Sequence, residues 1–152
     1  MTVWLFLPAY FANATPVVLH GGGPIDNGKN WSDGKRILGD HKTIYGTIAG
    51  IIIGATIAIL QGNTLQGSLF AVGAILGDMV FAFFKRRLGY PPGVSWPVAD
   101  QIGFILLAII FGSLVEPRPT LEQNGVVIIT TIPLHYLTNL FAWGLKMKKV
   151  PW

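Results

Sequence analysis

The feature that most constrains this chain is a set of five long apolar stretches separated by charged and turn-forming segments. A helix needs about 20 apolar residues to cross a hydrocarbon core of about 30 Å, and each stretch approaches that length. The stretches are residues 2–19, 43–61, 65–84, 97–115 and 125–145. Their apolar residues cover all sides of the expected helices, which argues against a soluble protein. We therefore expect an all-α integral membrane protein, a five-helix transmembrane bundle forming one domain over residues 1–152.

The distribution of basic residues predicts how this bundle is oriented. Ten of the eleven Lys and Arg residues lie in residues 20–42, in residues 85–96 or in the C-terminal tail, and Arg118 is the exception. The positive-inside rule then places the N-terminus outside and the C-terminus and both long loops in the cytoplasm. We expect a multi-pass protein of the cell membrane with its site facing the cytoplasm. The chain has no soluble basic domain, so nucleic acid is not an expected partner.

The first long loop contains a partial phosphate-binding motif. In "GGGPIDNGKN", residues 21–30, four residues separate Gly23 from Gly28 and Lys29. A true P-loop follows a β-strand and carries Ser or Thr after the lysine, whereas this stretch follows a membrane span and has Asn30 there. The motif match is therefore coincidental. Its glycines and Lys29 can still line a phosphate site as a lid over a cavity within the membrane.

Two aspartates near the cytoplasmic ends of the spans are the strongest candidate site residues. Asp78 lies seven residues before Lys85, which is about two helical turns inside its span. A carboxylate there is costly unless it is paired, hydrated or bound to metal. Asp100 lies at the inner start of the fourth span. A loop lysine can instead neutralise Asp78, and a helix N-terminus can favour Asp100, but together the two aspartates predict a shared Mg²⁺.

Polar residues in other spans fall at a similar depth. Asn13 lies seven residues before His20, and Asn139 lies seven residues before Lys146. With Asp78 they outline a polar cavity open to the inside, although hydrogen bonding between helices explains each asparagine equally well. Such a cavity suits metal-assisted phosphoryl or nucleotidyl transfer to a lipid, because that chemistry needs positioning and charge neutralisation more than a strong base.

One segment of the chain resembles a known family. The stretch "GDMVFAFFKRRLGYPPGVSWPVADQIGF", residues 77–104, is similar to the signature of the integral-membrane phosphatidate cytidylyltransferases. Together with "NATPV" in the first span and the first long loop, it most resembles their archaeal branch, the CDP-archaeol synthases. The similarity covers most of the chain. The likeness to the bacterial and eukaryotic members is limited to the C-terminal half.

The resemblance implies a nucleotidyltransferase of membrane phospholipid biosynthesis. Its substrates would be CTP and a polyprenyl glyceryl ether phosphate, digeranylgeranylglyceryl phosphate, and its products CDP-archaeol and pyrophosphate. Mg²⁺ would neutralise the developing charge. The family motif places Asp78 and Asp100 as catalytic metal ligands, and Lys85 and Arg86 as phosphate contacts, with Lys85 also catalytic.

This sequence departs from the broader signature in several places. "YPPGVSW" replaces a Lys-Asp pair and a His-Gly-Gly run, and Gln101 follows Asp100 where the family has Arg. The first long loop must then supply more of the substrate site. Its candidates are Asp26, Lys29, Lys35, Arg36 and Asp40, each of which can alternatively be a solvated turn charge.

Two other functions fit parts of the sequence. A small polytopic transporter would carry polar groups at the midplane or along a continuous path, whereas here they gather at the inner third. Another Mg-dependent lipid phosphotransferase, of the CDP-alcohol type, would need a D-G-x-x-A-R run that "SDGKR", residues 32–36, only begins.

Overall fold

A computed structural model describes residues 2–91, 94–96 and 98–146, and these residues form six helices and no β-strand. The helices are α1 (Thr2–Leu5), α2 (Leu7–Val18), α3 (Ile44–Leu60), α4 (Thr64–Arg87), α5 (Ala99–Gly112) and α6 (Leu121–Gly144). The all-helical class is thus confirmed. Residues 97 and 147–152, which the sequence placed at the start of the fourth span and in the tail, lie outside the described residues.

The helices follow the apolar stretches, with two differences. The first stretch is broken at Phe6, and Pro8 lies in the first turn of α2, where a missing N–H costs nothing. The sequence analysis assigned Lys85 and Arg86 to the second loop, residues 85–96, but α4 continues through Arg87. Basic side chains in the last turn are favoured by the helix dipole, and Gly89, with φ of +85°, ends the helix.

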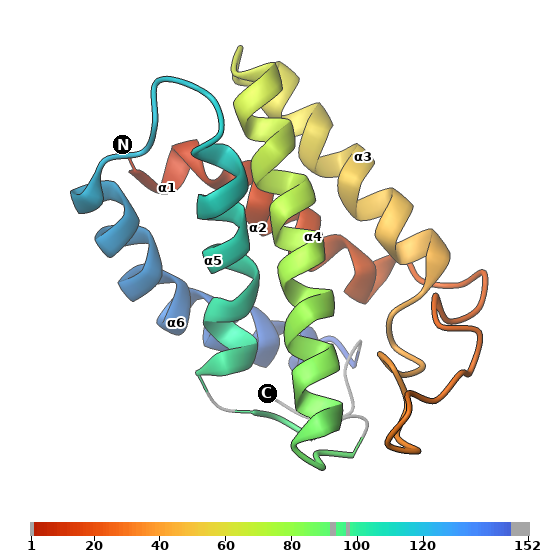
Figure 1. Ribbon diagram of the computed structural model, residues 1–152. Coiled ribbons are helices and arrows are strands. Elements are labelled where there is room, and N and C mark those ends of the chain that lie inside the picture. Colours follow the sequence, from red (N-terminus) through yellow and green to blue (C-terminus); the bar gives the residue numbers. More distant parts are fainter. Residues whose placement is uncertain (1, 92–93, 97, 147–152) are drawn as a thin grey trace.

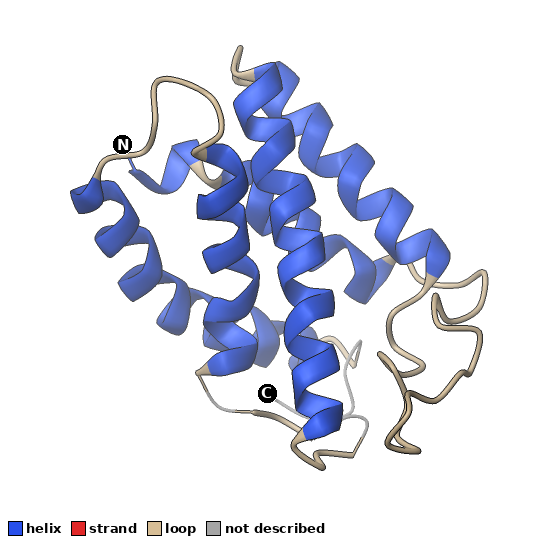
Figure 2. Cartoon of the chain, in the orientation of Figure 1, coloured by secondary structure: helices blue, strands red, loops and turns tan. Residues whose placement is uncertain are grey.

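The long α4 is the centre of the bundle. It packs against α2, α3 and α5, while α6 contacts α5 and the short α1 (Figure 1). The connection from α2 to α3 and the connection from α4 to α5 both lie at the lower end of the bundle in this view (Figure 2). The fold therefore gathers the two long loops around the C-terminal end of α4.

Glycines allow the central helices to approach closely. A Cβ atom on Gly50 would lie 2.7 Å from the Ala12 carbonyl oxygen of α2. One on Gly73 or Gly77 would lie 2.6 Å from a carbonyl oxygen of α5. These distances are too short for any side chain. In the sequence, the spacing of four residues between Gly46, Gly50 and Gly54, and between Gly73 and Gly77, is a small-residue pattern that predicts close helix packing, and the structure confirms it.

This packing predicts a large effect for Gly73→Val. The new side chain would meet the Leu107 carbonyl oxygen at 2.6 Å and the Ala108 Cα at 2.8 Å, both of which are backbone atoms that cannot step aside. Overpacking of this kind costs about 1–3 kcal/mol, and we expect a lowered thermal midpoint in detergent. Gly125→Val is the control, since a Cβ on Gly125 meets nothing within 4 Å. Equal midpoints for the two variants would contradict this packing argument.

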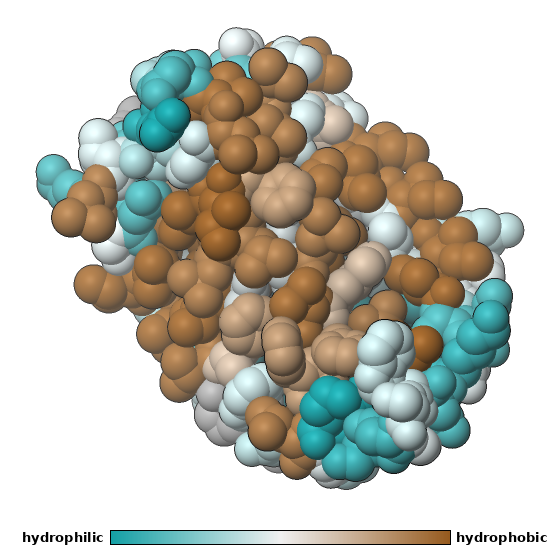
Figure 3. Space-filling model, in the orientation of Figure 1, coloured by the Kyte–Doolittle hydropathy of each residue, from teal (hydrophilic) through white to brown (hydrophobic). Residues whose placement is uncertain are grey.

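The surface has the distribution expected of a membrane-embedded chain. Apolar residues cover the middle of the face shown in Figure 3, and hydrophilic residues gather at its two ends. By length and hydropathy α4 and α6 can each cross a bilayer, and α3 and α5 are shorter apolar helices. Isoleucine and leucine side chains on α3 and α6 are widely exposed, which suits contact with lipid rather than water.

Candidate functional site

The first long loop is organised around the carboxylate of Asp26. This carboxylate accepts hydrogen bonds from the backbone N–H groups of Gly28, Leu38 and Gly39, at 2.9–3.1 Å. It also forms an ion pair with Arg36 at 2.7 Å, and its side chain is only 1% exposed. Burial alone would raise the pKa of Asp26, but the hydrogen bonds from Arg36 and the backbone outweigh it and hold that pKa well below its ordinary value. Asp26 is thus saturated by its own loop.

We expect Asp26→Asn to loosen this loop. An amide cannot accept this many hydrogen bonds, and losing those to a buried charge costs about 2–3 kcal/mol. Folding lowers the pKa of Asp26. The stabilisation by its charged carboxylate is therefore present above the unfolded pKa of about 3.9, and it is lost as the pH falls toward the pKa of Asp26 in the folded protein. Limited proteolysis of residues 20–42 should therefore be faster for Asp26→Asn at neutral pH. Asp40→Asn is the matched control, because Asp40 also pairs with Arg36 but is 67% exposed; equal cleavage rates would refute the role of Asp26.

Reciprocal contacts fix the loop to the end of α4. Arg87 forms an ion pair with Asp33 at 2.7 Å and donates hydrogen bonds to the carbonyl oxygens of Lys35 and Arg36. In return, the Lys35 ammonium donates to the Arg87 carbonyl at 2.9 Å. Trp31 adds an edge-on ring contact to Phe83. The loop is therefore held over the inner end of α4.

The two predicted catalytic aspartates are each paired with a lysine. Asp78 forms an ion pair with Lys42, two residues before the start of α3, so a loop lysine does neutralise Asp78, the alternative that the sequence left open. Asp100 pairs with Lys85 and accepts a hydrogen bond from the backbone N–H of Trp96 at 2.8 Å. Lys85 lies seven residues beyond Asp78 on α4, about 10 Å along the helix axis. Asp100 itself is nearer to Asp78 along the bundle, because Gly77 packs against the backbone of Gly103, three residues after Asp100.

Arg86 is buried without a counter-charge in contact. Its residue exposure is 7%, and within the described residues its Nε and Nη1 atoms have no hydrogen-bond partner. It borders a pocket of about 220 Å³ together with Lys35, Arg36, Gly89, Tyr90 and Pro91. A buried guanidinium with no carboxylate in contact is costly by itself, and it is a strong donor to phosphate oxygens. The cationic side chains of this pocket suit an anionic ligand, and it is called the anion pocket below.

Other predicted residues are placed away from these contacts. Lys29 is exposed, and its backbone takes part in the loop turns through Asp26 and Ile37. Asn139 is hydrogen-bonded to His135 at 3.1 Å within α6. Asn13 is half-buried on α2. The structure brings Lys35, Arg36 and Arg86 together, whereas Asp40 acts as the second partner of Arg36.

Sequence reasoning missed three residues that matter here. Lys42 pairs with Asp78, Arg87 anchors the loop, and Tyr90 lines the anion pocket while stacking on Trp96 at 5.9 Å. Lys42 could have been found, because it precedes the third helix at the same inner boundary as Asp78. The Arg87 contacts span more than fifty positions of sequence and leave no local signal.

The carboxylates of Asp78 and Asp100 suit a cation that is also bound by a nucleotide. They do not by themselves form a complete metal site. Among the described residues no group of three His, Cys, Asp or Glu side chains could hold a metal. Mg²⁺ on nucleotides usually takes one or two carboxylates and completes its shell with phosphate oxygens and water. Asp78 and Asp100 suit that arrangement by donor type, once a phosphate is present.

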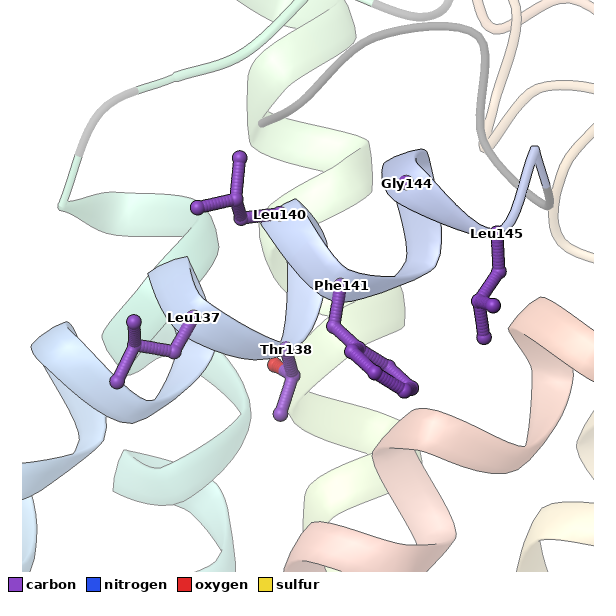
Figure 4. Close-up of a pocket in the computed structure, with 6 residues that line it drawn as sticks. All are labelled: Leu137, Thr138, Leu140, Phe141, Gly144 and Leu145. Atoms are coloured by element: carbon purple, nitrogen blue, oxygen red, sulfur yellow. The ribbon is translucent and has the colours of Figure 1, made fainter.

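A second hollow, of about 700 Å³, lies along the C-terminal half of α6 (Figure 4). It is lined by apolar groups, with Leu137, Phe141 and Leu145 turned to one side of the helix and Leu140 to the other. Among the described lining residues, Thr138 carries the one side-chain hydroxyl. Such a surface suits hydrocarbon rather than a charged ligand.

The fold and site together define a helical membrane protein with a cluster of cationic side chains at one end of its bundle. Comparison with known proteins gives the family. The chain matches the CarS-like family, CDP-archaeol synthase, over residues 1–68 and 63–152. It therefore belongs to the CDP-archaeol synthase family.

Individual relatives agree with this assignment. CDP-archaeol synthase of Pyrococcus horikoshii is 44% identical, with 98% of this chain and 94% of the relative covered. The Pyrococcus furiosus protein of the same name is 41% identical, covering 98% of this chain and 95% of the relative. A solved structure described as an intramembrane enzyme for archaeal membrane lipids biosynthesis matches with a TM-score of 0.81 and 37% identity. That match covers 91% of this chain and 92% of the solved chain.

Proposed function

We propose that this chain transfers the cytidylyl group of CTP to a polyprenyl glyceryl ether phosphate, digeranylgeranylglyceryl phosphate, and does so at the inner end of α4. Family membership makes the chain a nucleotidyltransferase that forms CDP-archaeol in a CTP-dependent reaction. The observation that carries the location of the site is the buried Arg86, whose Nε and Nη1 have no hydrogen-bond partner among the described residues, in a pocket with Lys35 and Arg36.

The reaction needs little proton transfer from the protein. An oxygen of the lipid phosphate, already ionised at neutral pH, attacks the α-phosphorus of CTP. A new P–O bond forms as the bond from the α-phosphorus to the bridging oxygen breaks, and pyrophosphate leaves with that electron pair. Catalysis then rests on positioning and on neutralising the charge that develops on the phosphates.

We assign these tasks to residues on α4, α5 and the first loop. Arg86, Lys35 and Arg36 bind the phosphates that leave as pyrophosphate, and Lys85 lies beside them on the same helical turn. Asp78 and Asp100 are the proposed cation ligands. A divalent cation bound there, for which Mg²⁺ is the best candidate, would supply positive charge to the phosphate oxygens. Asn13, Asn139, Asp26, Lys29 and Asp40 remain candidates for shaping the site around the substrates.

The membrane arrangement follows from the same placement. We propose five crossings, by α1 with α2, then α3, α4, α5 and α6, with the N-terminus outside and the charged end in the cytoplasm. The first-loop and α4 cations would then lie near anionic headgroups on the inner leaflet. The apolar hollow on α6 is available to the polyprenyl chains of the substrate. One domain, residues 1–152, would contain the entire site.

Reconstitution tests this function directly. The purified chain in ether-lipid nanodiscs should release pyrophosphate when CTP, Mg²⁺ and digeranylgeranylglyceryl phosphate are all present. The amount of pyrophosphate released should equal the amount of CDP-lipid formed. Removing the lipid phosphate or adding EDTA should stop the release, and exchanging Mg²⁺ for Mn²⁺ or Ca²⁺ identifies the preferred cation. No release under any lipid supply would contradict the proposal and would favour a transporter. Release from CTP with an alcohol acceptor would favour a different phosphotransferase.

A further inference from the structure

The Lys42 side chain connects a rigid part of the first loop to the carboxylate within α4. Its backbone is fixed on both sides: its N–H donates to Gly39 at 3.2 Å, and its carbonyl accepts from Ile25 at 2.8 Å. The next residue, Thr43, caps α3 by accepting from the Gly46 N–H. The backbone of Lys42 is therefore held, while its four-carbon side chain is the part free to change partner.

The carboxylates of Asp78 and Asp26 differ sharply in how they are held. Asp26 is saturated by backbone and guanidinium donors and is fully buried. In Asp78 only Oδ2 is engaged, by the Lys42 ammonium, and within the described residues no hydrogen bond to Oδ1 is found. The side chains of Lys42 and Asp78 are 23% and 34% exposed. A single ion pair with this exposure is weak and readily exchanged.

We infer that Lys42 is an exchangeable counter-ion that competes with a divalent cation for Asp78. Lys42 neutralises the carboxylate within the span when no cation is there, and it must leave Oδ2 for the carboxylate to use both oxygens as ligands. Lys42 is thus a positioning residue that sets how tightly Asp78 binds metal. This inference rests on the proposed role of Asp78 as a cation ligand.

Two substitutions of Lys42 should move metal affinity in opposite directions. Lys42→Met removes the competing ammonium and keeps the length of the side chain, so Asp78 is free. Lys42→Arg presents two parallel N–H donors to the carboxylate and holds it more firmly. A purely structural ion pair would predict loss of stability in Lys42→Met, with no gain in metal binding.

The test is a titration of the full chain in nanodiscs with Mn²⁺ and a non-hydrolysable CTP analogue, which supplies the phosphate oxygens, and electron paramagnetic resonance follows the protein-bound Mn²⁺. We expect Lys42→Met to bind Mn²⁺ about two- to fivefold more tightly than wild type, the ratio that corresponds to one partly exposed ion pair. Lys42→Arg should bind it more weakly. Lys146→Met removes the same charge from an exposed position after α6, and its affinity should match that of wild type.

The outcomes separate this inference from the function on which it rests. If Asp78→Asn removes Mn²⁺ binding but Lys42→Met leaves it unchanged or weaker, the competition is refuted and the cation site stands. If Asp78→Asn binds Mn²⁺ as wild type does, the cation site at Asp78 is itself wrong and the inference falls with it. If Lys42→Met does not fold, weaker binding in Lys42→Arg supports the competition, and equal or tighter binding refutes it.

Discussion

Asp78→Asn should reduce turnover about a hundredfold or more, since losing one metal ligand removes several kcal/mol of transition-state stabilisation. Asparagine keeps the size of the side chain and one oxygen, but not the charge that both Lys42 and a cation require. Because the Lys42 side chain is partly exposed, its ammonium can be hydrated and the bundle should still fold. The measurement is kcat for CDP-lipid formation in nanodiscs, with the thermal midpoint taken in parallel.

Two comparisons make this prediction specific. Glu122→Gln removes a carboxylate from an exposed site in the first turn of α6, and its turnover should match wild type. The double variant Asp78→Asn with Lys42→Met removes both members of the ion pair. If the pair served only to neutralise charge, the double variant would recover activity. Recovery, or more than about a tenth of wild-type turnover in Asp78→Asn, would contradict the metal role of Asp78.

Arg86→Met should raise the KM for CTP about tenfold or more while leaving the fold as stable as wild type or more so. The affinity loss follows from removing a charge-assisted donor to phosphate, worth about 1.5–3 kcal/mol. The expected stability follows from burial. Among the described residues two nitrogens of Arg86 have no partner, and the buried guanidinium bears a desolvation cost that methionine does not. This combination of effects is unusual for a buried residue.

The control for Arg86 is Arg118→Met, at the opposite end of the bundle. Arg118 pairs with Glu116 at 2.8 Å, and both side chains are largely exposed, so its loss should change neither the KM for CTP nor the thermal midpoint. An unchanged KM in Arg86→Met would show that the pocket does not bind the nucleotide. A large loss of stability would show that Arg86 has a structural partner in the folded protein.

The bundle could be predicted from sequence because its determinants are local and periodic. Apolar length predicted the regions that became α3 and α4, and the glycine spacing in them predicted close packing, which Gly50, Gly73 and Gly77 confirm. Asp78 stood out because a carboxylate within a span always needs compensation. These inferences used only neighbouring residues and the physics of the bilayer.

The details of the site depend on contacts between distant parts of the chain. Asp26 was predicted to contact substrate, but the structure commits it to the loop, because three backbone N–H groups of that loop point at its carboxylate. Lys85 and Arg86 were expected in a loop, yet favourable charge at a helix C-terminus extends α4 to include them. The Arg87 clamp joins segments about fifty residues apart, for which the sequence offers no periodic pattern.

The central claim is that the cytidylyl group of CTP is transferred to the lipid phosphate. Following the α- and γ-phosphates of CTP separately tests it most directly. CTP labelled with ³²P at either the α- or the γ-phosphate is incubated with the nanodisc-embedded chain, Mg²⁺ and digeranylgeranylglyceryl phosphate, and the lipid is extracted. The account predicts that the α-label enters the lipid and that the γ-label appears only in pyrophosphate, with neither product formed by Asp78→Asn. Transfer of the γ-label to lipid, or no transfer of the α-label, would contradict it.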